Sequence, residues 1–305
     1  MPVREILLLR HGHRLAWTFH PQTQTYASTR PFPSGLPADP PLASHGLRQS
    51  YETAAHLSEL LLPQIMEDRL RIYSSLSYRC LETLRPSVEA FQGLGWRGKV
   101  RGERGVGEWF GSAPFEQPAP GGWEGLRDRF FPCLQERKSR VVPSRYGESI
   151  DGLHDRLARA LEAIVGEVER EYEEEGRGGE DVTVMICGHA AGIIASGRVL
   201  TGRMPEDYEE EDFKCFTCGL SRFVRRDWKP AYVADGDMAQ TAENWRISGG
   251  VAGGWECLLN SGCEHLSQGE ERGWHFQGDE SFDSYERGTR KVDDTNEETA
   301  EGSKL

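Results

Sequence analysis

The amino-acid sequence predicts an α/β protein, a three-layer sandwich in which helices cover both faces of a mostly parallel central sheet. Two observations lead to this prediction. Short apolar runs without a helical period alternate along the chain with longer segments whose apolar residues recur at helical spacing. Two of these runs, ILLL (6–9) and VTVMIC (182–187), are almost continuously apolar, which is typical of strands buried on both faces of a parallel sheet.

The N-terminal part is expected to contribute three strands and two helices. The strands are residues 4–9, 70–75 and 98–103. The first helix follows Gly46 and ends at Pro63; its apolar positions at helical spacing are Leu47, Tyr51, Ala54, Leu57 and Leu61. The second helix contains Pro86 as a defect, and its pattern consists of Leu81, Leu84, Val88 and Phe91. Residues 15–45, rich in Pro, Ser and Thr, are predicted to form a long loop, and a loop of that length is often functional.

The remainder of the chain alternates in the same way. Residues 111–148 carry many Gly and Pro residues and are predicted to form a long excursion. A long amphipathic helix follows from Leu153 and ends in EEEGRGG. The strand at 182–187 precedes an alanine-rich helix from Ala190, and further strands are expected at 220–226 and 255–260. From about residue 278 the sequence is acidic and poor in apolar residues, which predicts one domain over 1–277 and a disordered tail over 278–305.

Composition excludes several functional classes. The formal net charge of −13 argues against general nucleic-acid binding and against an anionic membrane surface. No apolar run reaches about 18 residues, so no membrane-spanning helix is expected. The N-terminus lacks the pattern of a secretory signal. The seven scattered cysteines suit reduced thiols in an intracellular protein of the cytoplasm or nucleus.

One cysteine pair allows a second interpretation. Cys215 and Cys218 have the spacing of metal ligands, but Cys257 and Cys263, the nearest later pair, are separated by five residues. A closed zinc site usually combines two tight pairs or a set of cysteines and histidines. We therefore favour two cysteines at the start of a buried strand over a zinc site.

Residues with titratable side chains follow four of the predicted strands. In an open α/β sheet, reactive groups gather beyond the carboxyl ends of the strands, so these residues are expected to face one crevice. They are His11 after 4–9, Arg79 after 70–75, Glu108 after 98–103 and His189 after 182–187.

The residue types point to phosphoryl chemistry. A neutral imidazole can attack phosphorus, and planar guanidinium groups such as that of Arg10 match phosphoryl oxygens. Gly12 would let the backbone approach the bound group. The aromatic neighbours of Glu108 are expected to desolvate its carboxyl group and raise its pKa, so that it holds a proton for a leaving group. Each residue also has an ordinary structural alternative: ion pairs at a strand end, a helix-start arginine, an exposed loop glutamate and a satisfied core histidine.

Taken together, the order Arg-His-Gly, Arg, Glu, His resembles the histidine phosphatase superfamily, branch 1, which is also called phosphoglycerate mutase-like. The resemblance covers roughly residues 4–260 and includes the segments DPPLASHGLRQS and YGESIDGLHDR. It implies transfer of a phosphoryl group to His11 and hydrolysis of the phosphohistidine by water, without a metal or organic cofactor. The residues implied are Arg10, Arg79 and His189 in the phosphate pocket, Arg14 as its extension, and Glu108 as proton donor.

Shorter motifs resemble a fungal branch of that family. They are YRCLETLRP, ERGVGEWFG, GHAAG and LNSGCEHLSQGEERGWHF. The branch contains the phosphatase-domain subunit of the RNA polymerase III transcription factor TFIIIC and its stand-alone paralogues. The resemblance therefore implies either a phosphatase or a weakly catalytic or non-catalytic subunit with transcription-factor partners. A phosphoglycerate mutase fits less well, because the 20–40 loop and the 111–148 excursion depart from that pattern.

The sequence alone leaves the substrate and the cellular location open. Aromatic residues near the predicted pocket either line it or belong to the core; they are Trp17, Phe19, Tyr78, Trp109 and Phe110. A phosphoprotein carrying phosphotyrosine, a nucleotide and a sugar phosphate all fit such a pocket. The final tripeptide, Ser303-Lys304-Leu305, matches a peroxisomal address, although the acidic residues before it are unusual for one.

Overall fold

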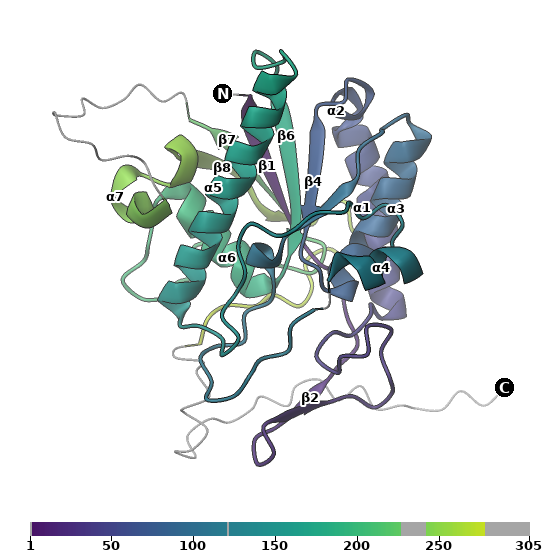
Figure 1. Ribbon diagram of the computed structural model, residues 1–305, viewed down its shortest axis with the longest axis vertical. Helices are drawn as coiled ribbons and strands as arrows, with labels where there is room; N and C mark the ends of the chain where they lie inside the picture. Colours follow the sequence, from purple (N-terminus) through teal and green to yellow (C-terminus); the bar gives the residue numbers. More distant parts are fainter. Residues whose placement is uncertain (1, 121, 227–241, 278–305) are drawn as a thin grey trace.

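The computed structural model describes residues 2–120, 122–226 and 242–277 (Figure 1). The predicted tail over 278–305 and its terminal tripeptide lie outside the described residues. Within the described residues, none of the helices combines the length and hydrophobicity needed to cross a membrane.

A six-stranded sheet forms the centre of the molecule, with the strand order β5-β4-β6-β1-β7-β8. The first four strands of this order are parallel to one another: β5 (Val100–Gly102), β4 (Leu70–Ser74), β6 (Val182–Gly188) and β1 (Val3–Arg10). The last two are antiparallel: β7 (Leu220–Arg225) pairs with β1, and β8 (Trp255–Gly262) pairs with β7. The predicted mostly parallel α/β sheet is confirmed.

Both faces of the sheet are covered, as continuous apolar strands require. In β1, Ile6 and Leu8 point into one buried cluster with α5 (Ile150–Glu174) and α6 (Ala190–Thr201). Leu7 and Leu9 point into the opposite cluster with α1 (Ser44–Leu60) and α3 (Tyr78–Gly93). Figure 1 shows α5 and α3 on opposite sides of the sheet. The short helices are α2 (Leu62–Met66), α4 (Trp123–Arg129) and α7 (Trp245–Ser248).

Helix α1 forms where predicted and buries Ala54 and Leu57 as expected, but the N-terminal part of its predicted apolar face is exposed. Leu47 and Tyr51 are 37% and 63% exposed. The helix instead buries polar side chains such as Gln49, whose Oε1 accepts a hydrogen bond from the backbone N–H of His13 (2.9 Å) and whose Nε2 donates to the hydroxyl of Thr217 (2.9 Å). A buried polar face is stable when it is hydrogen-bonded in this way. The N-terminal half of α1 thus supports the loop that follows β1.

The two long irregular segments contain short elements that the sequence did not reveal. A hairpin of β2 (Thr18–His20) and β3 (Thr25–Ala27) lies within the predicted loop, and α4 lies within the predicted excursion. Strands of three residues are too short to show a period, which explains why they were missed. The hairpin extends beyond the carboxyl edge of the sheet (Figure 1).

Candidate active site

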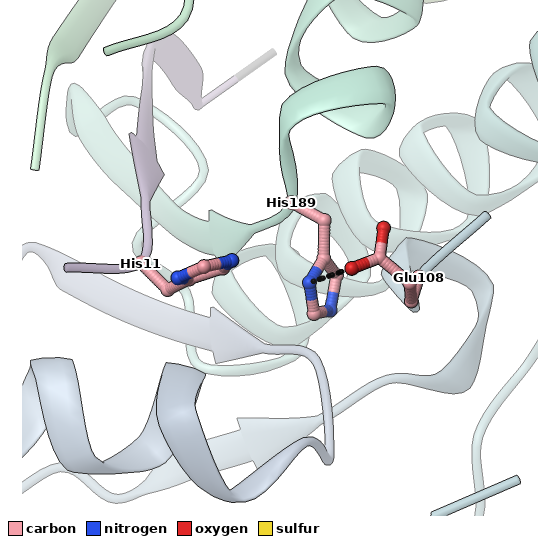
Figure 2. A group of neighbouring side chains, drawn as sticks. All are labelled: His11, Glu108 and His189. Atoms are coloured by element: carbon pink, nitrogen blue, oxygen red, sulfur yellow. Dashed lines mark ion pairs between the residues drawn. The ribbon is translucent and has the colours of Figure 1, made fainter. Parts of the chain in front are cut away.

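The predicted crevice exists at the carboxyl edge of the parallel strands. Arg10 and Gly188 are paired in the register of β1 and β6, so the residues that follow them, His11 and His189, are neighbours. Their ring centroids lie 5.4 Å apart in an edge-to-face arrangement. Figure 2 shows both rings and the carboxylate of Glu108 gathered in one place, with Glu108 arriving from the loop after β5.

His11 is held in one tautomer. Its Nδ1 lies 2.8 Å from the carbonyl oxygen of Gly12; because a carbonyl can only accept, Nδ1 carries the proton and Nε2 keeps its lone pair. Burial lowers the pKa of His11 well below its ordinary value, and the cations of Arg79, His189 and Arg10 lower it further. The ring is therefore neutral near pH 7.

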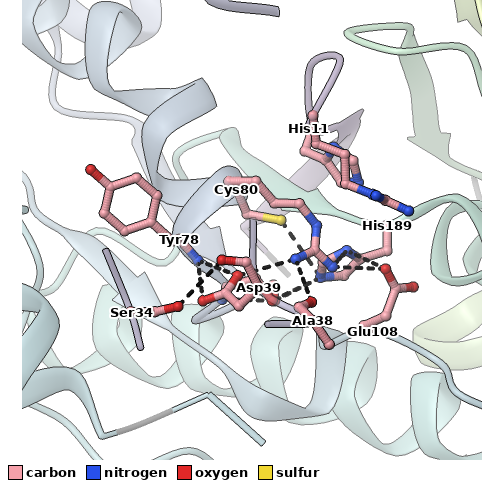
Figure 3. Close-up of polar contacts among 12 residues, drawn as sticks. His11, Ser34, Ala38, Asp39, Tyr78, Cys80, Glu108 and His189 are labelled. Carbon is pink, nitrogen blue, oxygen red and sulfur yellow. Dashed lines mark hydrogen bonds and ion pairs between the residues drawn. The ribbon is translucent and has the colours of Figure 1, made fainter. Parts of the chain in front are cut away.

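Arg79 contacts several polar side chains of the site. Figure 3 draws the polar contacts of this region, in which Asp39, Glu108 and His189 are labelled. It is fully buried, and its guanidinium donates to Oδ1 of Asp39 (3.1 Å) and to Oε2 of Glu108 (2.8 Å). Asp39 is itself held by the backbone N–H of Tyr78, at 2.9 and 3.1 Å from its two carboxylate oxygens. The Nε atom of Arg79 has no hydrogen-bond partner in the described part of the chain. A donor of Arg79 therefore remains for an anion.

His189 is embedded in hydrogen-bonding groups on both sides of its ring. Nδ1 lies 3.1 Å from Oε2 of Glu108, and Nε2 lies 2.9 Å from the hydroxyl of Ser75 and 3.6 Å from Sγ of Cys80. Burial alone would lower the pKa of His189, but the negative charges of Cys80 and Glu108 raise it to about 8. His189 is thus charged near pH 7, in contrast to His11.

The ionisation of Glu108 differs from the prediction. Burial does favour a raised pKa, as expected from its aromatic neighbours. However, the charge and hydrogen bond of His189, together with the charge of Arg79, hold the pKa of Glu108 well below its ordinary value. The expectation of a protonated Glu108 is therefore wrong for the unliganded site, because the nearby cations outweigh desolvation.

The two remaining predicted arginines lie at the periphery of the crevice. Arg10 donates to the carbonyl oxygens of Cys215 (2.6 Å) and Arg272 (2.5 Å), and its Nε is buried without a partner among the described residues. Arg14 donates to the carbonyl oxygen of Leu15 (3.0 Å) and lies over the ring of Trp17. Burial, together with the positive charges of Arg79 and Arg10, lowers the pKa of Arg14 to about 10.

The charges of this pocket do not cancel. Four positive groups face two carboxylates and the thiol of Cys80, whose pKa is lowered to about 5, so the site still has an excess of positive charge inside a protein whose net charge is −13. An anionic phosphoryl group is attracted to that excess. The positive groups are Arg10, Arg14, Arg79 and His189, and the carboxylates are Asp39 and Glu108.

Metal binding at the same place is a weaker alternative. Single ligand atoms of His11, Glu108 and His189 all lie within 4.8 Å of one another. The guanidinium of Arg79, however, already contacts Glu108 (2.8 Å) and lies 3.2 Å from Nδ1 of His189. A divalent cation would be repelled by this guanidinium and its neighbours. The side chains around His11 and His189 therefore favour an anion over a metal ion.

The cysteines at 215 and 218 do not form part of this metal-competent set, which is the one found among the described residues. Sγ of Cys215 contacts the carbonyl oxygen of Trp274 (3.1 Å), and Cys218 packs against Cys263 and Leu266. Burial raises the pKa of Cys218 to about 12, which disfavours the thiolate that zinc requires. These cysteines begin the segment leading into β7, as the favoured interpretation expected.

Gly12 has a structural role that the sequence did not suggest. A Cβ atom at this position would lie 2.9 Å from the carbonyl oxygen of Gly46 and 3.3 Å from Sγ of Cys218. The glycine therefore permits α1 to approach the loop after β1. The close approach is to the protein's own helix.

Four contacting residues were not singled out from the sequence. Ser75 and Ser77 follow β4 directly, at the same kind of strand end as His11, so this position was a usable signal. Cys80 lies one residue after Arg79 in α3. Asp39 comes from the long loop, and no local pattern connects it with Arg79.

Fold and site together define an α/β protein with a buried anion pocket at the carboxyl edge of a mostly parallel sheet. The chain belongs to branch 1 of the histidine phosphatase superfamily, whose family model matches residues 6–237. The family expected from the sequence is confirmed.

Two solved phosphatases are similar in structure. The ecdysone phosphate phosphatase of Bombix mori has a TM-score of 0.51 at 18% identity, covering 77% of this chain and 97% of that one. A mycobacterial glucosyl-3-phosphoglycerate phosphatase has a TM-score of 0.48 at 16% identity, covering 85% and 99%. At 18% identity, the similarity to the Bombix mori phosphatase shows a shared fold and no more.

A sequence relative lies in the transcription machinery. The chain is 29% identical over 290 residues to the transcription factor tau 55 kDa subunit of Saccharomyces cerevisiae. The match covers 90% of this chain but 59% of the yeast protein. The expected similarity to a transcription-factor subunit is thereby confirmed.

Proposed function

We propose that this protein is a metal-independent phosphatase that hydrolyses a phosphomonoester through a phosphohistidine on His11. The observation that carries the proposal is the pairing of a neutral His11, with its Nε2 lone pair free, and a charged His189 across one positively charged pocket. A nucleophile and an electrostatic stabiliser of the phosphoryl oxygens are the two parts that such a reaction requires.

In the first step, Nε2 of His11 attacks phosphorus, the bond from phosphorus to the ester oxygen breaks, and the leaving oxygen takes a proton from Glu108. The low pKa of Glu108 does not prevent this. A bound dianion offsets the cations that keep Glu108 ionised, so the carboxylate takes up a proton before the transfer. Nδ1 of His189, which carries a proton, lies 3.1 Å from Oε2 of Glu108. Arg79, together with Arg10 and Arg14, neutralises charge on the phosphoryl oxygens.

In the second step, water attacks the phosphohistidine. Glu108, now a carboxylate, removes a proton from that water, the bond from Nε2 to phosphorus breaks, and inorganic phosphate leaves. His11 returns to its starting state. Every group used in the two steps lies in the pocket described above.

The test is hydrolysis of 1-naphthyl phosphate by the wild-type chain and by His11→Ala. We expect loss of at least about 10³-fold in kcat/KM and loss of acid-labile protein-bound phosphate. His20→Ala is the matched control, because His20 is exposed and lies in the β2–β3 hairpin. Activity that survives His11→Ala would refute the mechanism.

A second candidate function is a subunit of an RNA polymerase III transcription factor, located in the nucleus, with activity secondary to assembly. The 29% identity to the yeast tau 55 kDa subunit over 90% of this chain favours it. Affinity purification of the full chain from its own cells tests this function. Co-purification of other subunits of that factor supports it, and a chain that elutes alone argues against it.

A further inference from the structure

A cavity of about 510 Å³ adjoins the phosphate pocket. Arg79 and Glu108 belong to its wall, so the cavity begins where a leaving group would emerge from a phosphoryl group bound beside His11. Most of the rest of the wall comes from three loop segments, at 36–39, 107–120 and 142–148; residues 75–77 and Arg104 complete it. Its volume falls in the range of cavities that enclose ligands of drug-like size, about 300–1,000 Å³.

The walls of this cavity combine polar residues with a substantial apolar surface. Val142 is 57% exposed despite its hydrophobic side chain, and Phe110 is half-buried. Exposed apolar groups that line a concave surface favour an apolar ligand. The apolar lining includes Leu36, Leu76, Phe110, Pro118, Pro120 and Val142.

The carboxylates of the cavity are already paired. Asp39 and Glu108 contact Arg79, Glu116 contacts Arg145, and Glu148 contacts Arg156. They therefore leave little negative charge to attract a cationic ligand.

Two side chains of the lining have donors without an acceptor among the described residues: Arg104, which is partly exposed, and Gln117, which is buried. The guanidinium of Arg104 has no hydrogen bond or ion pair within the described ranges of the chain. Gln117 is only 9% exposed; its Oε1 accepts from the hydroxyl of Tyr26 (2.7 Å), whereas its Nε2 is buried without a partner among the described residues. A buried donor without an acceptor is costly, and a ligand that supplies the acceptor removes that cost.

We propose that this cavity binds the leaving group of an aryl phosphomonoester that also carries a carboxylate. The ring contacts the apolar wall around Phe110 and Val142, the carboxylate pairs with Arg104, and Nε2 of Gln117 donates to an oxygen of the ligand. This assignment deepens the proposed function and rests on it, because the phosphoryl group must lie beside His11. A small ester such as phosphoserine would leave most of the cavity unfilled.

The test compares kcat/KM for three substrates: 4-carboxyphenyl phosphate, phenyl phosphate and phosphoserine. We expect kcat/KM to fall in that order. Arg104→Gln should lower kcat/KM for the carboxylated substrate by about tenfold and leave the value for phenyl phosphate within about twofold. Arg97→Gln is the matched control, because Arg97 is exposed and lines a different cavity. Equal loss on all substrates, or a preference for phosphoserine, would overturn the assignment while the phosphatase function stands.

A binding measurement separates the two proposals. The His11→Ala variant lacks the proposed nucleophile but keeps the cavity, so calorimetry with 4-carboxyphenylphosphonate measures binding alone. In the His11→Ala background, a further Arg104→Gln change should weaken binding of the phosphonate about tenfold. If that weakening is seen but the wild-type chain hydrolyses none of the three substrates, the cavity assignment is supported and the phosphatase function is refuted. No binding of this phosphonate, together with active hydrolysis of phosphoserine, refutes the cavity assignment.

Discussion

The phosphate pocket and the neighbouring cavity are built in different ways. The histidines of the pocket lie directly at the ends of β1 and β6, and Arg79 begins α3 just after β4. The cavity is lined mainly by loops, and Nε2 of its residue Gln117 is buried without a partner among the described residues. Strand ends hold side chains rigidly for chemistry, whereas loops can vary the ligand that is accepted. The contrast predicts that changes in the pocket affect all substrates and changes in the cavity affect only some.

The largest effect is expected from Arg79→Gln. This change removes the group that neutralises phosphoryl charge, so kcat/KM should fall by about 10³-fold for every substrate. It also leaves Asp39 and Glu108 without their partner, so we expect a loss of about 3 kcal/mol in the free energy of unfolding. Steady-state kinetics and urea denaturation measure the two effects. Arg79→Lys, which keeps the charge, should recover stability more than activity.

Glu108→Gln should have an effect that depends on the leaving group. The amide cannot donate a proton, so kcat should fall by about 10²-fold for an alkyl phosphate. For 4-nitrophenyl phosphate, whose leaving group is a weak base, the loss should be much smaller. Rates across a series of leaving groups measure this difference. A uniform loss across the series would contradict the role of proton donor.

The two histidines predict the pH dependence of kcat/KM. The pKa of His189 is raised to about 8, so its charged form is lost and activity falls as pH rises through 8. The lowered pKa of His11 keeps that ring neutral below pH 6.5, so the acidic limb lies below this value. The same shift of His189 contributes stability that is fully present below about pH 6.5 and is lost through pH 8.

Cys80 provides a sharper version of that test. Its charge and hydrogen bond are among the causes that raise the pKa of His189. Cys80→Ala should therefore move the basic limb of the pH profile to lower pH, while kcat/KM on the plateau changes little. A basic limb that stays in place would show that Cys80 does not influence His189.

The smallest effect is expected from removal of metal ions. The pocket carries excess positive charge, so a chelator should leave kcat/KM within about twofold. Hydrolysis of 1-naphthyl phosphate before and after dialysis against EDTA measures this. A loss restored by Zn²⁺ would favour the His11, Glu108 and His189 set as a metal site.

The parts of the molecule that were predictable rest on local patterns. The runs ILLL and VTVMIC are buried strands because their residues are apolar on both faces. The side chains that follow such strands must meet at one edge of a parallel sheet, which is why His11 and His189 were expected to be neighbours. The exposed face of α1 was mispredicted, because Leu47 and Tyr51 fit a helical period as well as the buried polar residues do.

The sequence by itself determined the strands of the central sheet, the long helices and the residue types delivered to the carboxyl edge. Only the tertiary structure decided how those residues are charged. Glu108 is ionised and His189 is protonated because each is placed beside groups that are remote in the sequence. A pKa depends on distance in space and on burial, and neither quantity is contained in a local pattern of residues. The hydrogen bond between Asp39 and Arg79, which are forty residues apart in the sequence, is likewise decided only by the tertiary structure.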